Sequence, residues 1–239
     1  MKIEILYPEI CNLYGDSYNY RYLKQSLKNG NFIETSLNDK PKFIDKKNQV
    51  NFVYIGSMTE DNQKLVISKL LPYKKEIKDY IENNNIILAT GNSFEIFGNY
   101  IKEGENKTEA LEIFDFYTEL DYNHRHNSLF IGEFNNSKIV GFKSEFSFSY
   151  PETNDYNFIK VSRGVGINKD TDYEGIRYKN FYGTYLLGPI LPMNPHFTKF
   201  LLKEAGYPED PAFMDAAMDA YDFRVKELLS PETVITPNH

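Results

Sequence analysis

The chain has 239 residues, of which 41% are hydrophobic and 26% charged, and it carries a formal net charge of −7. This acidic balance, without a basic cluster, argues against nucleic acid or an anionic membrane as the main partner. The single cysteine, Cys11, excludes an internal disulfide. No apolar run approaches the roughly 18 residues of a membrane span, and the start does not resemble a signal peptide. We therefore expect a cytoplasmic protein without membrane insertion, folded as one domain over residues 1–239.

The first hundred residues alternate between strand-like and helix-like patterns. Short apolar runs predict strands at residues 3–7, 32–37, 52–55 and 86–89. Helical spacing predicts helices at residues 20–27, 60–84 and 93–101. Pro72 divides the second of these, so that one helix ends near Leu71 and another begins at the proline. Strands that alternate with helices indicate a parallel sheet with helices on both faces.

From residue 114 onward the pattern changes to short alternating runs. These predict further strands, some of them antiparallel, at residues 114–122, 128–134, 138–148, 158–164 and 183–187. Two helices, at 197–206 and 213–229, are expected before a loose tail at 233–239. The expected fold is α/β, with a mostly parallel central sheet flanked by helices and some antiparallel strands.

Open α/β sheets bind ligands at the carboxyl ends of their strands, which points to the loops at 12–19, 56–63 and 91–95. The turn at Gly56 and Ser57 either presents backbone N–H groups to an oxyanion or is a plain strand-to-helix turn. Gly91 stands in a sharp turn of the kind where many α/β enzymes place a Ser or Cys nucleophile. Glycine relaxes such a turn but removes the nucleophile.

Other residues with reactive side chains each have an ordinary interpretation. Ser93 as a nucleophile needs a base within reach, whereas as a helix N-cap it needs none. The stretch NHRHN (123–127) is either a two-histidine metal patch or a solvated turn, and the turn is favoured. Cys11 is either a reactive thiol or a small packed side chain, and packing is favoured.

Three stretches together resemble a known family. They are NLYGD (12–16), YIGSMTEDNQ (54–63) and EGIRYKNFYGTYLLGPILPMNP (174–195). The chain resembles the class I glutamine amidotransferase domain of the cobyric acid synthase (CobB/CobQ) type over nearly its whole length. Within that type it is most similar to the glutaminase subunits of bacterial lipid II isoglutaminyl synthases. The resemblance implies a flavodoxin-like fold and a role in peptidoglycan biosynthesis.

The same resemblance exposes three departures from the family pattern. The family motif A-x-C-G-G-Y-Q, with its cysteine nucleophile, falls on ATGNSFE, so that the nucleophile position is Gly91. The histidine base of G-T-Y-L-H-G-P falls on Leu187. A third motif, G-F-E-N-H-x-G-R-T, falls near residues 141–150, which read GFKSEFSFSY. We therefore expect no functional catalytic residue at the family positions. The expected substrate-binding residues are Gly56, Ser57, Asn92, Ser93, Glu95 and Arg163.

These observations favour a subunit that has lost glutaminase activity and acts as scaffold or regulator of a Mur-ligase-type synthase subunit, as a heterodimer. Glutamine or a related small molecule is a candidate ligand, and no cofactor or metal is expected. Two alternatives stay open. One is an active amidotransferase, supplying ammonia for peptidoglycan or cobyric acid-type amidation through another residue such as Cys11, Ser93 or Glu95. The other is a small-metabolite-binding module in the same cleft.

Overall fold

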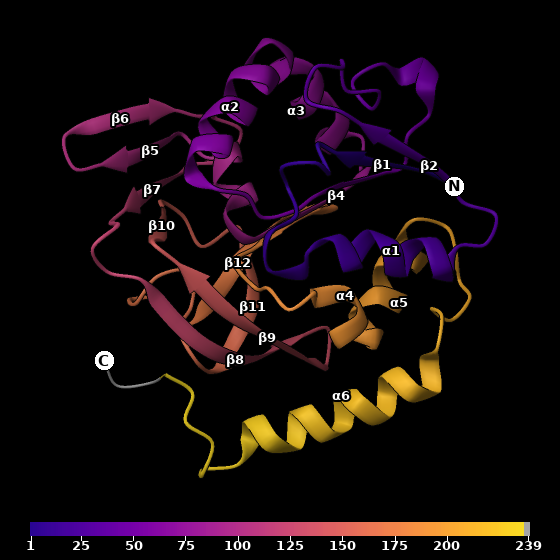
Figure 1. Ribbon diagram of the computed structural model, residues 1–239, viewed down its shortest axis with the longest axis vertical. Helices are drawn as coiled ribbons and strands as arrows, with labels where there is room; N and C mark the ends of the chain where they lie inside the picture. The colour runs from indigo at the N-terminus through magenta and orange to yellow at the C-terminus, as the bar shows by residue number, and fades with distance from the viewer. Residues whose placement is uncertain (237–239) are drawn as a thin grey trace.

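The computed structural model describes residues 1–236 and contains two β-sheets with helices around them (Figure 1). The larger sheet has, in spatial order, β2 (Asn31–Thr35), β1 (Lys2–Leu6), β3 (Phe52–Ile55), β4 (Ile86–Thr90), β13 (Phe181–Thr184), β12 (Tyr173–Tyr178), β11 (Asn157–Arg163), β8 (His126–Phe134) and β9 (Ser137–Glu145). The smaller sheet has the order β10 (Ser147–Pro151), β7 (Phe116–Leu120), β5 (Tyr100–Glu103) and β6 (Asn106–Glu109).

The large sheet joins a parallel half to an antiparallel half. Strands β2, β1, β3, β4 and β13 are all parallel to one another, and this 2-1-3-4-5 order is the flavodoxin-like one. From β13 the sheet continues through β12, β11, β8 and β9, each antiparallel to its neighbour. The α/β fold expected from the sequence is therefore confirmed, and the carboxyl ends of β1, β3, β4 and β13 lie at one edge.

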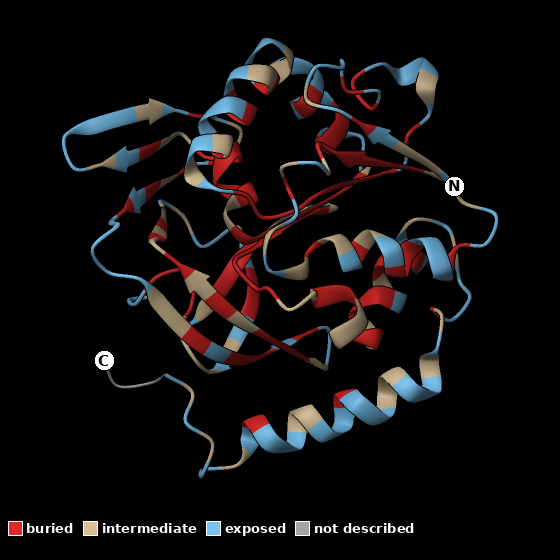
Figure 2. Ribbon diagram, in the orientation of Figure 1, coloured by how far each residue is buried: buried red, intermediate tan, exposed pale blue. Residues whose placement is uncertain are grey.

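Helices cover both faces of the parallel half and bury its inner strands β1, β3, β4 and β13 on both sides, whereas the edge strand β2 is partly exposed. On one face α2 (Glu60–Leu70) and α3 (Lys74–Glu82) pack against strand side chains such as Val53 and Ile87. On the other face α1 (Ser17–Ser26), α4 (Ile190–Met193) and α5 (Pro195–Glu204) pack against Tyr54 and Leu88. Figures 1 and 2 show these two helix layers and the buried strands between them.

The last helix, α6 (Met214–Leu229), packs on the outside of α4, α5 and the β8–β9 pair and is mostly exposed (Figure 2). Its buried side chains Tyr221 and Leu228 pack against Ile131 of β8 and Val140 of β9. The segment after α6 returns to the sheet, where the Leu129 amide donates to the Ile235 carbonyl at 2.8 Å. The expected loose tail is thus anchored as far as it is described, and its end, 237–239, lies outside the described residues. No helix within residues 1–236 is both long and apolar enough to cross a membrane.

The division at Pro72 is confirmed, but the helix expected at residues 93–101 is wrong. The structure has a 3-10 helix at Gly91–Phe97, and Tyr100 and Ile101 belong to β5, which pairs with β7. Between them Gly98 approaches Phe116 so closely that an added Cβ would lie 2.6 Å from its ring. Pairing with a strand distant in sequence has overridden the local helical pattern.

Candidate functional site

Asp16 ties together the carboxyl ends of three strands. Its side chain is fully buried, and Oδ2 accepts hydrogen bonds from the Ser57 amide at 2.7 Å and the Thr90 hydroxyl at 2.8 Å. Asn19 donates to Oδ1 at 3.2 Å. Burial raises the pKa of Asp16, and these donors oppose that rise. The loop after β1 is thereby fixed to the turns after β3 and β4.

Gly56, directly after β3, permits a close backbone approach. A Cβ at this position would lie 2.4 Å from the Cys11 carbonyl oxygen, so only glycine fits. Cys11 itself is buried, its sulfur 3.9 Å from that of Met58. Burial raises the pKa of the Cys11 thiol, which disfavours the thiolate needed for nucleophilic attack.

The backbone at Gly91 has the sharp turn at which related enzymes place a nucleophile, but the structure leaves no room there for a side chain. Its φ is +60°, in the left-handed region that strains other residues. A Cβ added here would lie 2.5 Å from the Ser57 Cβ and 3.2 Å from Leu187 Cδ2. The side chains of Ser57 and Leu187 therefore occupy the space around the position of the family nucleophile.

A cavity of about 250 Å³ opens beside this turn. Ser57, Gly91, Asn92 and Leu187 line it, together with residues 144–147 at the end of β9 and the start of β10. The Asn92 side chain fastens the turn to the loop after β3: it accepts from the Met58 amide at 3.0 Å and donates to the Met58 carbonyl at 2.9 Å. The three stretches that depart from the family pattern thus meet at one cavity.

Behind the cavity wall Glu95 forms a buried hydrogen-bond network. Its carboxylate accepts from Gln63 at 2.7 Å, from the Tyr185 hydroxyl at 2.8 Å and from the Ser147 hydroxyl. Burial raises the pKa of Glu95 to about 7, although these three donors lower it. Glu95 can therefore exchange a proton near neutral pH.

The β9–β10 segment places its charged side chains inward. Lys143 and Glu145 are buried, whereas Phe142 before them and Phe146 after them are only half-buried. Lys143 Nζ lies 2.9 Å from a Glu174 carboxylate oxygen and 3.2 Å from one of Glu145. Alternation along a strand normally buries its apolar set, so the inverted pattern marks this segment as built for something other than packing.

The structure brings together five of the six expected binding residues. Ser57 and Asn92 line the cavity, and Gly56 lies directly before Ser57. Ser93 and Glu95 are buried in the turn behind it. The Ser93 hydroxyl lies 2.7 Å from the Thr90 carbonyl oxygen and 3.1 Å from that of Ile55.

Arg163 lies elsewhere. Its guanidinium donates to the carbonyls of Leu228 and Ser230, each at 2.6 Å, and of Thr233 at 3.0 Å. It does not line the cavity, so its structural role is to hold the chain after α6.

Sequence reasoning missed four residues of the site. Asp16 was visible only as part of the NLYGD motif, and nothing local marks Tyr185 or Arg125 as cavity residues. Arg125 lies over the Phe146 ring at 4.6 Å and donates to the Tyr14 hydroxyl. The available signal for Glu145 was the alternation of charged and aromatic residues in GFKSEFSFSY.

The NHRHN stretch forms a turn that leads into β8. His124 pairs with Asp121 at 2.6 Å, with 83% of its side chain exposed, and a His126 ring nitrogen lies 3.0 Å from the Ser128 hydroxyl. Within residues 1–236 no three histidine, cysteine or acidic side chains are arranged to hold a metal ion.

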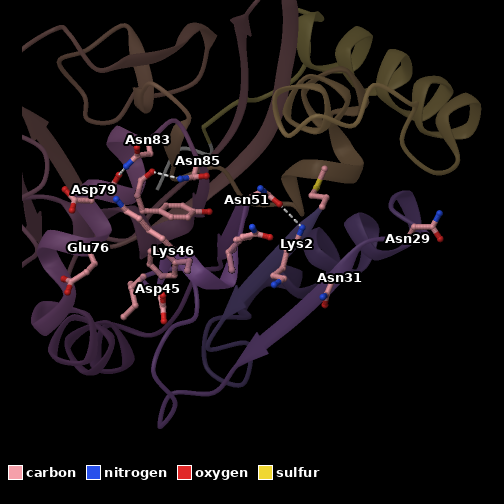
Figure 3. Close-up of a pocket in the computed structure, with 16 residues that line it drawn as sticks. Lys2, Asn29, Asn31, Asp45, Lys46, Asn51, Glu76, Asp79, Asn83 and Asn85 are labelled. Carbon is pink, nitrogen blue, oxygen red and sulfur yellow. Dashed lines mark hydrogen bonds between the residues drawn. The ribbon is translucent and has the colours of Figure 1, made fainter.

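A larger cavity, of about 710 Å³, lies at the opposite end of the parallel sheet (Figure 3). It surrounds the amino ends of the strands, where Lys2 opens β1 and Asn51 and Asn85 directly precede β3 and β4. Several of its polar groups already form hydrogen bonds with adjacent segments of the protein, as in the hydrogen bond that the Lys2 amide donates to the Asn51 side chain at 3.0 Å. Ligand sites in open α/β sheets lie at the carboxyl ends, so the smaller cavity is the candidate functional site.

The flavodoxin-like order, with a positive-φ turn after β4 and a glycine turn after β3, defines an α/β fold whose candidate site lies at the carboxyl ends of its parallel strands. Solved structures agree in fold. One described as a glutamine amidotransferase matches with a TM-score of 0.55 at 12% identity, over 85% of this chain and 98% of that one. The PurLQS structure from Thermotoga maritima matches with a TM-score of 0.52 at 13% identity, over 94% and 98%.

The model of the CobB/CobQ-like glutamine amidotransferase domain matches residues 2–195, and the chain belongs to this family. Two similar relatives are the GatD subunits of lipid II isoglutaminyl synthase (glutamine-hydrolyzing). The subunit from Staphylococcus aureus is 32% identical over 85% of both chains. That from Streptococcus pneumoniae is 29% identical over 86% of this chain and 80% of its own. The resemblance seen in the sequence is confirmed.

Proposed function

We propose that this chain is a GatD-like subunit of a lipid II isoglutaminyl synthase that does not hydrolyse glutamine, and that it binds and regulates a Mur-ligase-type synthase subunit. The observation that carries the proposal is Gly91 at the turn after β4, with Ser57 and Leu187 filling the space around it. Glutamine hydrolysis in this family begins with attack by a thiolate, which a histidine activates. Glycine cannot attack, and leucine cannot carry a proton.

The other candidate nucleophiles are poorly placed for the same reaction. Ser93 is fully buried, with its hydroxyl directed to backbone carbonyls, which are not bases. Cys11 is buried against Met58 with a raised thiol pKa. Glu95 can move a proton, but it lies behind the wall of the cavity. These contacts support a silent subunit over an amidotransferase that uses another residue.

The test measures two properties of the full-length chain together with the Mur-ligase-type protein of its own genome. Size-exclusion chromatography with light scattering should show a stable complex. Ammonia release from glutamine should stay at the rate of the buffer blank, with or without the partner. Release at an enzymatic rate would refute the loss of activity, and failure to form a complex would refute the scaffold role.

A further inference from the structure

Strand β6 is an open edge of the small sheet. Among residues 1–236 it pairs with β5 on one side and with no strand on the other, and its hairpin projects from the body of the molecule (Figure 1). The opposite edge, β10, is closed: the Ser149 amide donates to the Ile167 carbonyl at 3.2 Å, and its carbonyl accepts from Asn168 at 2.8 Å. An open edge offers its backbone N–H and C=O groups to another strand.

The groups that β6 offers belong to Lys107 and Glu109. A two-residue turn joins β5 to β6, and in such a hairpin the two residues that flank the turn exchange hydrogen bonds. From Asn106, which flanks the turn, the direction toward β5 recurs at every second residue. The Ala110 amide follows this alternation, because it donates to the Asn99 carbonyl at 3.0 Å. The N–H and C=O groups of Lys107 and Glu109 therefore point away from β5.

The side chains along this edge are complementary to those of a second copy. When two β6 strands pair in antiparallel fashion about a two-fold axis at Thr108, Lys107 of each copy lies opposite Glu109 of the other. These are also the two residues whose backbone groups point outward, so the pair forms four backbone hydrogen bonds. Both charged side chains lie on one face of the sheet, with 48% and 59% of their surface exposed. Thr108 faces its own copy, which is a favourable cross-strand pair.

A lysine on an edge strand is also a common guard against unwanted pairing. Such a guard works by repulsion, when charges of one sign meet across the new pair. On β6 the two outward positions carry opposite signs, at Lys107 and Glu109. An antiparallel copy of the same strand therefore meets attraction at both positions, which favours a second copy of this chain as the occupant of the edge.

We propose that two copies of this chain associate through their β6 strands, so that their small sheets join into one continuous sheet. Each copy contributes only the four residues Asn106–Glu109, so the dimer belongs to the weak class whose formation depends on concentration. No residue of β6 lines the candidate cavity, and the association therefore does not depend on the proposed function. Where each copy also holds a synthase subunit, the pairing brings two synthases together.

The association is measured by sedimentation velocity of the full-length chain from about 10 µM to 1 mM, the range in which a small interface dissociates. We expect a monomer–dimer equilibrium within this range. Lys107→Glu and Glu109→Lys each place like charges opposite one another, and each should weaken the dimer about tenfold. Glu105→Lys is the matched control, because this exposed residue lies in the turn and faces no strand. The control should leave the dimer unchanged.

An equimolar mixture of the two single variants separates charge pairing from loss of folding. The acidic strand of Lys107→Glu faces the basic strand of Glu109→Lys in the mixed pair, so the charges are complementary again. Native mass spectrometry should show the heterodimer in excess over either homodimer. A variant that fails to fold cannot pair in the mixture, and restored pairing therefore shows that both variants are folded.

Thr108→Cys tests the register of the two strands. With the axis at residue 108, the two new cysteines form a pair without backbone hydrogen bonds, whose Cα atoms lie about 4.5 Å apart and within reach of a disulfide. Oxidation with diamide should give a covalent dimer. Lys107→Cys is the control on the same strand, because its two copies lie about 7–8 Å apart, and the native Cys11 is buried.

The proposal is overturned by a chain that stays monomeric over the whole concentration range, or by single variants that pair no better when mixed. A dimer that forms equally well in Lys107→Glu and Glu109→Lys shows that the copies meet through another surface and also overturns it. Covalent dimers of Lys107→Cys in place of Thr108→Cys contradict the two-fold axis at Thr108. Ammonia release from glutamine, which tests the proposed function, is measured separately and bears on none of these outcomes.

Discussion

At the scale of single residues, Gly91 and Ser57 form a complementary pair. Substitution of Gly91 by alanine brings two costs: a left-handed φ and a Cβ 2.5 Å from that of Ser57. We expect Gly91→Ala to lower the free energy of unfolding by about 2–5 kcal/mol, combining roughly 1–2 from the backbone and 1–3 from overpacking. Urea denaturation measures the loss.

Gly104 provides a control for the backbone cost. Its φ is +57°, and nothing lies within 4 Å of its added Cβ, so Gly104→Ala should lose only the backbone part of about 1–2 kcal/mol. Adding Ser57→Gly to Gly91→Ala should restore part of the difference, as a coupling of about 0.5–3 kcal/mol. Equal losses for the two alanine variants would show that the space beside Gly91 is open.

Glu95 makes stability depend on pH near neutrality. Because burial raises its pKa to about 7 from the usual 4.5, the folded state favours the protonated form. Its contribution is complete at acid pH and declines as pH rises from about 4.5 to 7, by up to about 1.4 kcal/mol per pH unit. In Glu95→Gln this decline should be absent, so the difference in unfolding free energy between variant and wild type should change over that window. A constant difference from pH 5 to 8 would show that Glu95 does not titrate there.

At the scale of elements, the arginine on β11 is a tether for the end of the chain. The fork of Arg163 reaches three carbonyls, at Leu228, Ser230 and Thr233, and lysine cannot reproduce that fork. We expect Arg163→Lys to speed amide hydrogen exchange about tenfold or more in residues 225–235, through loss of about 1.5–3 kcal/mol of charge-assisted bonding, while the parallel strands stay protected. Arg224→Lys, on α6, is the control. Unchanged exchange would mean that packing alone holds the segment.

The elements also show where sequence patterns succeed. Strands β1, β3 and β4 are buried on both faces, so their continuous apolar runs were readable, as was the break at Pro72. Strand β12 and the β5–β6 hairpin were missed because their residues mix polar and apolar types, although each pairs with the strand that follows or precedes it in the chain. An apolar pattern reports burial, and it does not mark strands that are held by hairpin pairing between residues of mixed polarity.

At the scale of the whole molecule, the site is assembled from parts that the sequence separates. The turn at Gly91 and the loop at Ser57 were identifiable, because they follow readable strands. Three features could not be identified from the sequence, because each depends on which strand ends meet. They are the contact of Ser57 with Gly91, the hydrogen bonds of Asp16 to the turns after β3 and β4, and the burial of Glu145 without a hydrogen-bond donor. The resemblance to the family motifs located the positions at which the catalytic residues are replaced. It did not show that Ser57 and Leu187 fill the space beside Gly91.

The same assembly predicts that restoring the lost side chains does not restore the reaction. In a triple variant, Ser57→Gly makes room for Gly91→Cys, and Leu187→His supplies a base. We expect no ammonia release from glutamine, because residue 91 is buried, and burial raises the pKa of a thiol. The pH profile of iodoacetamide alkylation should have a midpoint above about 8.5, the usual thiol value. Turnover by the triple variant would show instead that the glutamine site is intact and that only its two reacting groups have been lost.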